Sequence, residues 1–259
     1  MSNSNYKKNN FKAVFFDFGG TLMDAESDKK AHYYMMKEIK KIYQLPASAE
    51  ELLTLYEKQL FNQDMTLKDN KDNAKNNNKD GYYFHKLHFY SELAFQSILQ
   101  QFNKKVTPND LQLFHENYLE NHLKYIHLVE GAWEAILLVK EKDYHCGIIS
   151  DIDLDYQQEQ FKALNIDQAF HSITTSEEVK QYKPAALIFQ VALHKANCQG
   201  EETFMIGDSY SKDIIGGKNM AMTTIWINRY QNQIDKKNIS ADFTVTELKE
   251  ILPILNNFL

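Results

Sequence analysis

The sequence predicts an α/β fold, a doubly wound parallel sheet with a helical domain inserted after its first strand. An apolar run at residues 12–18 is followed by a Gly-Gly-Thr turn, which is typical of a buried strand. Residues 26–127 carry apolar side chains at helical spacing, and runs of β-branched residues disappear. From residue 131 onward, helical segments alternate with short apolar strands, which indicates a parallel sheet covered on both faces.

The inserted region is predicted to be a helical cap domain over residues 24–128. The apolar spacing places its helices near 26–44, 48–62, 82–102 and 109–127. Ser48 and Glu51 form a capping-box pattern, and Thr107 precedes a proline at a first helical position. The Asn/Lys-rich segment at about 66–81 has almost no apolar residues, so we expect a solvated loop there.

The α/β core domain is predicted to comprise residues 1–23 and 129–259. Its strands after the first are expected at 144–149, 169–173, 203–206, 223–227 and 242–245. Its helices are expected at 131–142, 154–164, 184–197 and 211–220, with one more at the C-terminus.

Composition and charge exclude several classes of protein. The 259 residues include 29 Lys and Arg against 35 Asp and Glu, a net charge of −6, which argues against binding nucleic acid or anionic lipid through bulk positive charge. The aliphatic run at 135–139 is too short to cross a bilayer, and the first ten residues lack the apolar stretch of a secretory signal. We therefore expect a cytoplasmic protein with no nucleic-acid or membrane partner.

Two residue types are scarce. Cys146 and Cys198 fit no metal-binding or disulfide spacing, which favours reduced, buried thiols. Arg229 is the single arginine, so we expect that the protein does not bind phosphate or carboxylate groups with an arginine clamp. His85 and His88 share a predicted helix at metal-ligand spacing, but no third ligand accompanies them.

Polar residues gather where the predicted strands end. Asp17 follows the first strand, Ser150 and Asp151 follow the next, and Asp208 follows the strand at 203–206 with Asp213 a turn later. Ligands bind at the carboxyl ends of the strands in such sheets, so these side chains are expected to converge. Clustered carboxylates repel one another unless a cation lies between them, and oxygen ligands suit Mg²⁺.

A lysine completes this set. Lys183 precedes the predicted helix at 184–197 and is expected at the same edge of the sheet. A metal and a lysine beside a carboxylate are what phosphoryl transfer requires, because that reaction depends on positioning and charge neutralisation.

The ordered motifs DFGGT, Ser150, Lys-Pro at 183–184 and GDSxxxxD, with a helical insertion after the first, resemble the haloacid dehalogenase superfamily with a C1-type cap. Residues 147–221 are similar to a phosphatase branch that includes archaeal members. The resemblance implies a Rossmann-like core and a Mg²⁺-dependent phosphatase that acts on a small phosphorylated metabolite.

The resemblance also implies residue roles. Asp17 is implied as the nucleophile that forms an aspartyl-phosphate, with Ser150 and Lys183 contacting the phosphoryl group. The implied Mg²⁺ ligands are Asp17, the carbonyl of Gly19 and Asp208, supported by Asp213. Backbone N–H groups of the turn at Gly19, Gly20 and Thr21 are expected to form an anion-binding nest.

One position departs from the family pattern. Phosphatases of this family carry an aspartate two residues after the nucleophile as a general acid and base, and here Gly19 occupies that position. General acid–base catalysis contributes about 10²–10⁴-fold in rate, so its loss favours substrates with good leaving groups. Asp151 and Asp153 are candidates to replace it, and Asp151 is also a candidate substrate-binding residue.

Three alternatives remain. A 2-haloacid dehalogenase is disfavoured because such enzymes bring an arginine from the cap, and none is present there. A phosphonatase-like C–P hydrolase needs a cap lysine, and Lys37, Lys40 and Lys41 are available without one being singled out. A phosphate- and Mg²⁺-binding protein with little activity is favoured only by Gly19.

Overall fold

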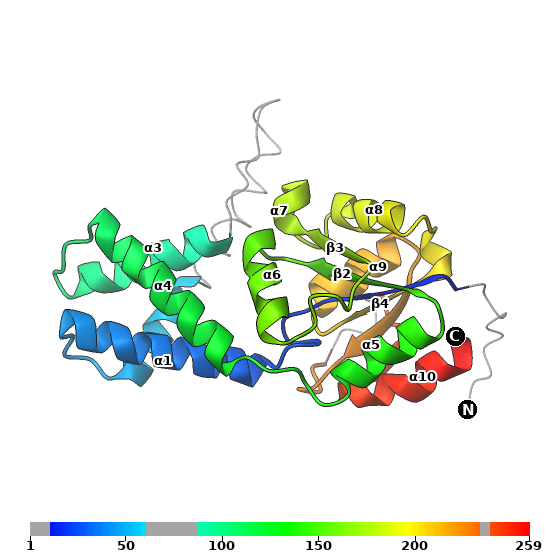
Figure 1. Cartoon of the computed structure of the whole chain (residues 1–259), viewed down its shortest axis with the longest axis horizontal. Coiled ribbons are helices and arrows are strands. Elements are labelled where there is room, and N and C mark those ends of the chain that lie inside the picture. The colour runs from blue at the N-terminus through cyan, green and yellow to red at the C-terminus, as the bar shows by residue number, and fades with distance from the viewer. Residues whose placement is uncertain (1–10, 61–86, 234–238) are drawn as a thin grey trace, which may run out of the picture. The chain divides into compact units, whose positions relative to one another are not determined.

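The computed structural model describes residues 11–60, 87–233 and 239–259, and the predicted loop at 66–81 lies outside them. The chain divides into two compact units (Figure 1). One, the α/β unit, combines Met1–Ala25 with His127–Leu259, and the other, the helical unit, is Glu26–Ile126.

The α/β unit contains a parallel six-stranded sheet with the order β3-β2-β1-β4-β5-β6 (Figure 1). The strands are β1 (Ala13–Phe16), β2 (His145–Ser150), β3 (Ser172–Thr175), β4 (Thr203–Gly207), β5 (Thr223–Ile227) and β6 (Phe243–Val245). The predicted fold class is therefore confirmed. The strand order matters for function, because it places β1 between β2 and β4.

Strand β1 is the centre of the sheet. All four of its residues are buried, which explains why its sequence is continuously apolar instead of alternating. Phe16 pairs in register with Ile148 of β2 and Ile206 of β4, so these three strands end side by side. Strand β3 begins three residues after its predicted start, because Ala169 first closes a turn onto the Ile166 carbonyl (3.0 Å).

Helices cover both faces of the sheet. α5 packs with α10 on one face, and α8 packs with α9 on the other (Figure 1). The helices are α5 (Ala132–Glu141), α6 (Leu154–Ala163), α7 (Ser176–Val179), α8 (Ala186–Lys195), α9 (Ile215–Asn219) and α10 (Ile251–Phe258). The helix predicted at 211–220 is instead a π-helical turn, Tyr210–Ile214, that leads into α9.

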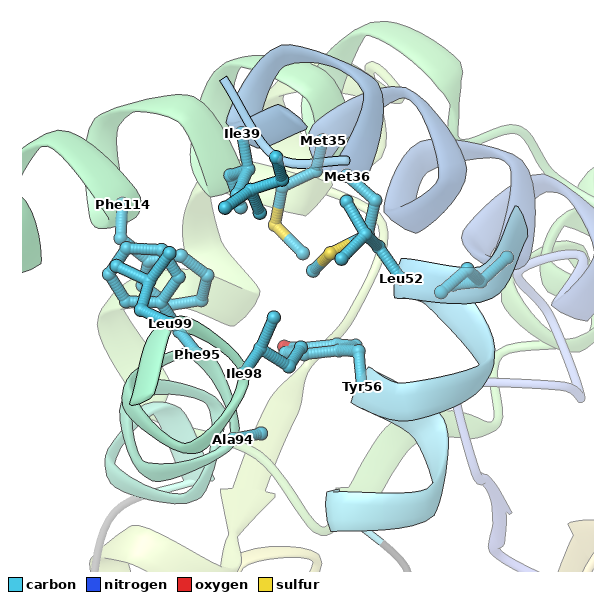
Figure 2. Packing of buried hydrophobic residues seen from close by; sticks show 12 residues of the cluster. Met35, Met36, Ile39, Leu52, Tyr56, Ala94, Phe95, Ile98, Leu99 and Phe114 are labelled. Atoms are coloured by element: carbon cyan, nitrogen blue, oxygen red, sulfur yellow. The ribbon is translucent and has the colours of Figure 1, made fainter. Parts of the chain in front are cut away.

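The helical unit contains α1 (Ala25–Tyr43), a helix over residues 49–60, α3 (Leu87–Gln101) and α4 (Pro108–Tyr125). Its core is an apolar cluster that all four helices supply (Figure 2). The labelled members are Met35, Met36, Ile39, Leu52, Tyr56, Ala94, Phe95, Ile98, Leu99 and Phe114. Both predicted N-terminal signals are confirmed, since Ser48 and Glu51 hydrogen-bond reciprocally and Thr107 forms a capping box.

The two cysteines are as the sequence predicts. Cys146 and Cys198 are both buried and free of disulfides. Burial raises the pKa of the Cys146 thiol to about 12, so it stays protonated at neutral pH. Within the described residues, no helix is both long and apolar enough to cross a membrane.

Candidate active site

The candidate site lies at the carboxyl edge of the sheet, where β1, β2 and β4 end. Asp17 directly follows β1, Ser150 is the last residue of β2, and Asp208 directly follows β4. The backbone N–H of Asp17 donates to the carbonyl of Ile206 (2.9 Å), which ties the start of the β1 turn to β4. The central position of β1 therefore places Asp17 among residues supplied by both neighbouring strands.

Two side chains hold the Asp17 carboxylate, which is only 7% exposed. The Lys183 ammonium donates to Oδ1 (2.6 Å), and the Thr21 hydroxyl donates to Oδ2 (2.9 Å). A carboxylate offers about four acceptor sites, so each oxygen keeps capacity for another partner. Thr21 Oγ1 also accepts from the backbone N–H of Asp208 (3.1 Å), which couples the two strand ends.

Lys183 links the acidic residues of the site. Its ammonium donates to Asp17, to Asp213 Oδ1 (2.7 Å) and to the carbonyl of Ile149 (3.0 Å), which uses all three of its protons. Burial alone lowers the pKa of Lys183, but the carboxylates of Asp17 and Asp213 outweigh it, so the pKa is raised. Lys183 is therefore a fixed positive charge at any physiological pH.

Glycines allow the acidic residues to approach the backbone. Gly20 has φ +80°, and a Cβ there would lie 2.4 Å from Asp208 Oδ2. Gly207 is the last residue of β4, and a Cβ there would lie 2.2 Å from Asp213 Oδ2. Both glycines are therefore required by the close packing of a carboxylate.

The charges of this cluster do not balance. Three carboxylates, from Asp17, Asp208 and Asp213, lie around the ammonium of Lys183, and the charge of Arg229 also acts on Asp208. Burial raises the pKa of Asp213 to about 7, with the Lys183 charge opposing the shift. Burial also raises the pKa of Asp208 to about 6, and the nearby charge of Asp17 adds to it. Burial is the largest cause of both shifts, and the charge of Asp17 adds to each of them.

These residues fit a divalent cation. One oxygen from each of Asp17, Asp208 and Asp213 lies within 4.8 Å of the other two. An all-oxygen set with excess negative charge is the donor chemistry that Mg²⁺ prefers. A bound cation would relieve the repulsion among these carboxylates, which adds to the effect of burial on the two pKa values.

The other candidate residues occupy less direct positions. Ser150 is buried at the end of β2, next to the Ile149 carbonyl that Lys183 contacts. Asp151 accepts a hydrogen bond from the backbone N–H of Lys183 (2.9 Å) and pairs with Lys212 (3.1 Å). Asp153 is buried at the N-terminus of α6.

Gly19 leaves space where the family pattern has an acid. A Cβ built at Gly19 would approach only Met23 Cε, at 4.0 Å. No steric conflict at this position therefore demands a glycine.

The structure places two residues at this site that the sequence analysis did not assign to it. Arg229 donates to the carbonyl of Gly20 and, at 3.5 Å, to that of Thr21. The Trp226 indole donates to the backbone carbonyl of Asp208 (2.9 Å). These contacts are possible because β5 lies beside β4. Through them, Arg229 positions the turn after β1, and Trp226 positions the segment after β4 that carries Asp208.

The chain matches known proteins across this site. A model of the haloacid dehalogenase-like hydrolases matches residues 14–227. The glyceraldehyde 3-phosphate phosphatase of Pyrococcus furiosus is 30% identical over 163 residues, 62% of this chain and 68% of that protein.

Further matches agree with these two. The protein of the same name from Methanothermobacter thermautotrophicus is 32% identical over 125 residues, so the match spans 46% of this chain and 55% of that protein. The pyrophosphatase PpaX of Listeria welshimeri is 28% identical over 168 residues, 62% of this chain and 76% of its own length. A phosphatase from Thermococcus onnurineus has a similar fold, with a TM-score of 0.64 and 22% identity over 95% of this chain and 98% of that one.

Proposed function

This chain belongs to the haloacid dehalogenase-like hydrolase family, and from that premise we propose that it is a Mg²⁺-dependent phosphatase that works through an aspartyl-phosphate on Asp17. Its substrate is a small phosphorylated metabolite. One observation carries the proposal, the buried Asp17 carboxylate held by Lys183 and Thr21 beside two further carboxylates.

The first step is attack on phosphorus by an Asp17 oxygen. An ionised carboxylate needs no base to become a nucleophile, and Thr21 and Lys183 fix its orientation. A bond forms between that oxygen and phosphorus while the bond from phosphorus to the ester oxygen breaks. The leaving alkoxide takes up a proton, and the phosphoryl group remains on Asp17.

The second step is hydrolysis. Water attacks the phosphorus of the aspartyl-phosphate, the bond to the Asp17 oxygen breaks, and inorganic phosphate leaves with the carboxylate regenerated. Lys183 offsets negative charge in both steps, since its ammonium already contacts the Asp17 carboxylate. Mg²⁺, held by Asp17, Asp208 and Asp213, would neutralise charge on the phosphoryl oxygens.

The proton for the leaving group does not come from residue 19, which is glycine. Asp151 is engaged by the Lys183 backbone and by Lys212, contacts that suit an ionised acceptor better than a proton donor. The site therefore favours esters and anhydrides whose leaving groups need little protonation. Matches to phosphatases of a triose phosphate and of pyrophosphate agree with a small, highly charged substrate.

Phosphate release from p-nitrophenyl phosphate tests the proposal directly. Wild type in Mg²⁺ should release p-nitrophenol, while EDTA treatment and Asp17→Asn should each abolish release. Metal-dependent release that persists in Asp17→Asn would contradict the role of Asp17. Halide release from 2-chloropropionate, with no phosphate release, would identify a dehalogenase instead.

A further inference from the structure

A second set of ligand-type side chains lies within the helical unit. Asp28 and His32 stand four residues apart on α1, and His122 stands on α4. One nitrogen or oxygen from each lies within 4.8 Å of the other two. Residues four apart share a helix face, so α1 presents an Asp and a His together to α4.

One separation within this set is close to the distance between two ligands of a metal ion. His122 Nε2 hydrogen-bonds to Asp28 Oδ1, whereas His32 Nδ1 lies 3.8 Å from Asp28 Oδ2, which is beyond hydrogen-bonding distance. Zinc–ligand bonds of about 2.0–2.1 Å in a tetrahedron place neighbouring ligand atoms about 3.3 Å apart. The pair that does not hydrogen-bond is therefore close to that spacing already.

His32 lacks the bonds of a purely structural histidine. The side chain of His32 is only 14% exposed. Its Nε2 is buried and has no hydrogen-bond partner among the described residues, whereas buried polar atoms usually have one. Burial lowers the pKa of His32, with the charge of Asp28 opposing the shift. A neutral imidazole has a lone pair on one nitrogen and a proton on the other, so one ring nitrogen of His32 can bind a metal while the other keeps its proton.

The other two ligands are equally suited. Asp28 Oδ1 bonds to His122, and Asp28 Oδ2 faces His32, so this carboxylate lies beside both imidazoles. The side chain of His122 is 3% exposed and that of Asp28 is 34% exposed, so an ion can enter from the Asp28 side.

Aromatic rings fix the two imidazoles. His122 stacks on Tyr118 at 5.6 Å with an interplanar angle of 5°. His32 lies between Tyr56 and Tyr118, at 5.4 and 5.6 Å. Side chains locked by packing hold ligands in place before the metal arrives.

We propose that Asp28, His32 and His122 bind a divalent transition-metal ion of the Zn²⁺ class. Two imidazoles and one carboxylate favour Zn²⁺ and Co²⁺ over Mg²⁺, and water completes the coordination. The ion joins α1 to α4 through ligands 94 residues apart, so it stabilises the helical unit. This site is chemically distinct from the all-oxygen cluster of the α/β unit.

Cobalt substitution tests the site independently of catalysis. Tag-free, full-length protein is first treated with EDTA, dialysed and placed in excess Mg²⁺ to occupy the oxygen cluster, and Co²⁺ is then added. Four-coordinate Co²⁺ with nitrogen ligands absorbs visible light much more strongly than six-coordinate Co²⁺ with oxygen ligands. We expect one strongly absorbing Co²⁺ per chain, displaced by Zn²⁺, and a rise in Tm.

Matched variants show which residues bind the absorbing Co²⁺. His32→Gln and His122→Gln should each weaken Co²⁺ binding by at least about 100-fold. His115→Gln should leave it unchanged, because His115 pairs with Glu92 but no third ligand side chain of the described segments joins them. Asp17→Asn should also keep the signal, so failure of the proposed phosphatase chemistry and failure of this site are distinguishable.

Two results would overturn the site. One is the absence of strong absorption in wild type, and the other is strong absorption that persists in folded His32→Gln and His122→Gln. Circular dichroism establishes folding. If buried His122→Gln does not fold, the more accessible His32→Gln decides the question.

Discussion

The protein has two clusters of possible metal ligands, and their side chains differ in kind. In the α/β unit, three carboxylates and a lysine meet where parallel strands end. In the helical unit, one carboxylate meets two imidazoles on facing helices. The carboxylates of the first set repel one another and depend on positive charge, whereas the second set holds a single carboxylate that lies beside two histidine rings. Single substitutions should therefore cost far more in the first cluster than in the polar contacts of the helical unit.

The largest effect is expected at the nucleophile. Asp17→Asn keeps the shape of the side chain but removes the ionised oxygen that attacks phosphorus, so kcat should fall by about 10⁴-fold or more. Steady-state release of phosphate from p-nitrophenyl phosphate measures this. The control is Asp167→Asn, at an exposed aspartate outside the site, which should leave kcat unchanged.

The next largest effect is on stability. Lys183→Met removes the ammonium that bonds to both Asp17 and Asp213, and breaking a buried ion pair from one side costs about 3–5 kcal/mol. Urea unfolding in EDTA measures the loss. Lys162→Met, which breaks an exposed pair with Glu159, should cost under about 1 kcal/mol. Equal losses in the two variants would contradict the contrast between buried and exposed charge.

Alanine substitutions at Gly20 and Gly19 test whether the site requires a glycine at each of these neighbouring positions. Gly20→Ala places a Cβ against Asp208 at a residue with φ +80°, which costs about 1–2 kcal/mol from the backbone alone. It should also weaken Mg²⁺ binding, because Asp208 must move. Gly19→Ala adds only an ordinary contact with Met23, so its Mg²⁺ affinity should match wild type in isothermal titration calorimetry.

The smallest effect is expected in the helical unit. Tyr43 donates to Asp110 (2.7 Å) and so joins the end of α1 to the start of α4. Tyr43→Phe should cost about 0.5–1.5 kcal/mol at pH 7, because the unit rests mainly on its apolar core. Thermal unfolding at several pH values measures this cost.

The pH dependence of that cost has a definite sign. Hydrogen bonds from Thr107 and then Tyr43 lower the pKa of Asp110. A lowered carboxyl pKa adds stability above the ordinary value of 3.8 and loses it as the pH falls through the folded value. The difference between wild type and Tyr43→Phe should therefore shrink below pH 3.8. A constant difference would show that the hydrogen bond does not depend on the charge of Asp110.

Much of the α/β unit could be predicted because its elements are marked by short, continuous stretches of sequence. A fully buried central strand gives a continuous apolar run, and the residues that end β1 and β4 follow directly in sequence. Asp17 and Asp208 are therefore visible as strand-end motifs. Lys183 is predicted at the same edge because it precedes the predicted helix at 184–197, but its three contacts are seen only in the structure.

Residues that act across the fold could not be predicted in this way. Arg229 reaches the turn after β1 from the segment after β5, 209 positions away from Gly20, and no local pattern encodes that contact. Asp28 and His32 show helical spacing, but their third partner depends on α1 facing α4. The histidine pair that the sequence did suggest, His85 and His88, has side chains outside the described residues.

The central claim is that Asp17 carries the phosphoryl group during turnover. Borohydride reduces an acyl phosphate to the alcohol, so quenching a reaction with p-nitrophenyl phosphate and Mg²⁺ into borohydride should convert Asp17 into homoserine. Peptide mass spectrometry detects this change, which should be absent with EDTA. Phosphate release at full rate with Asp17 unmodified, or modification of a different carboxylate, would contradict the account.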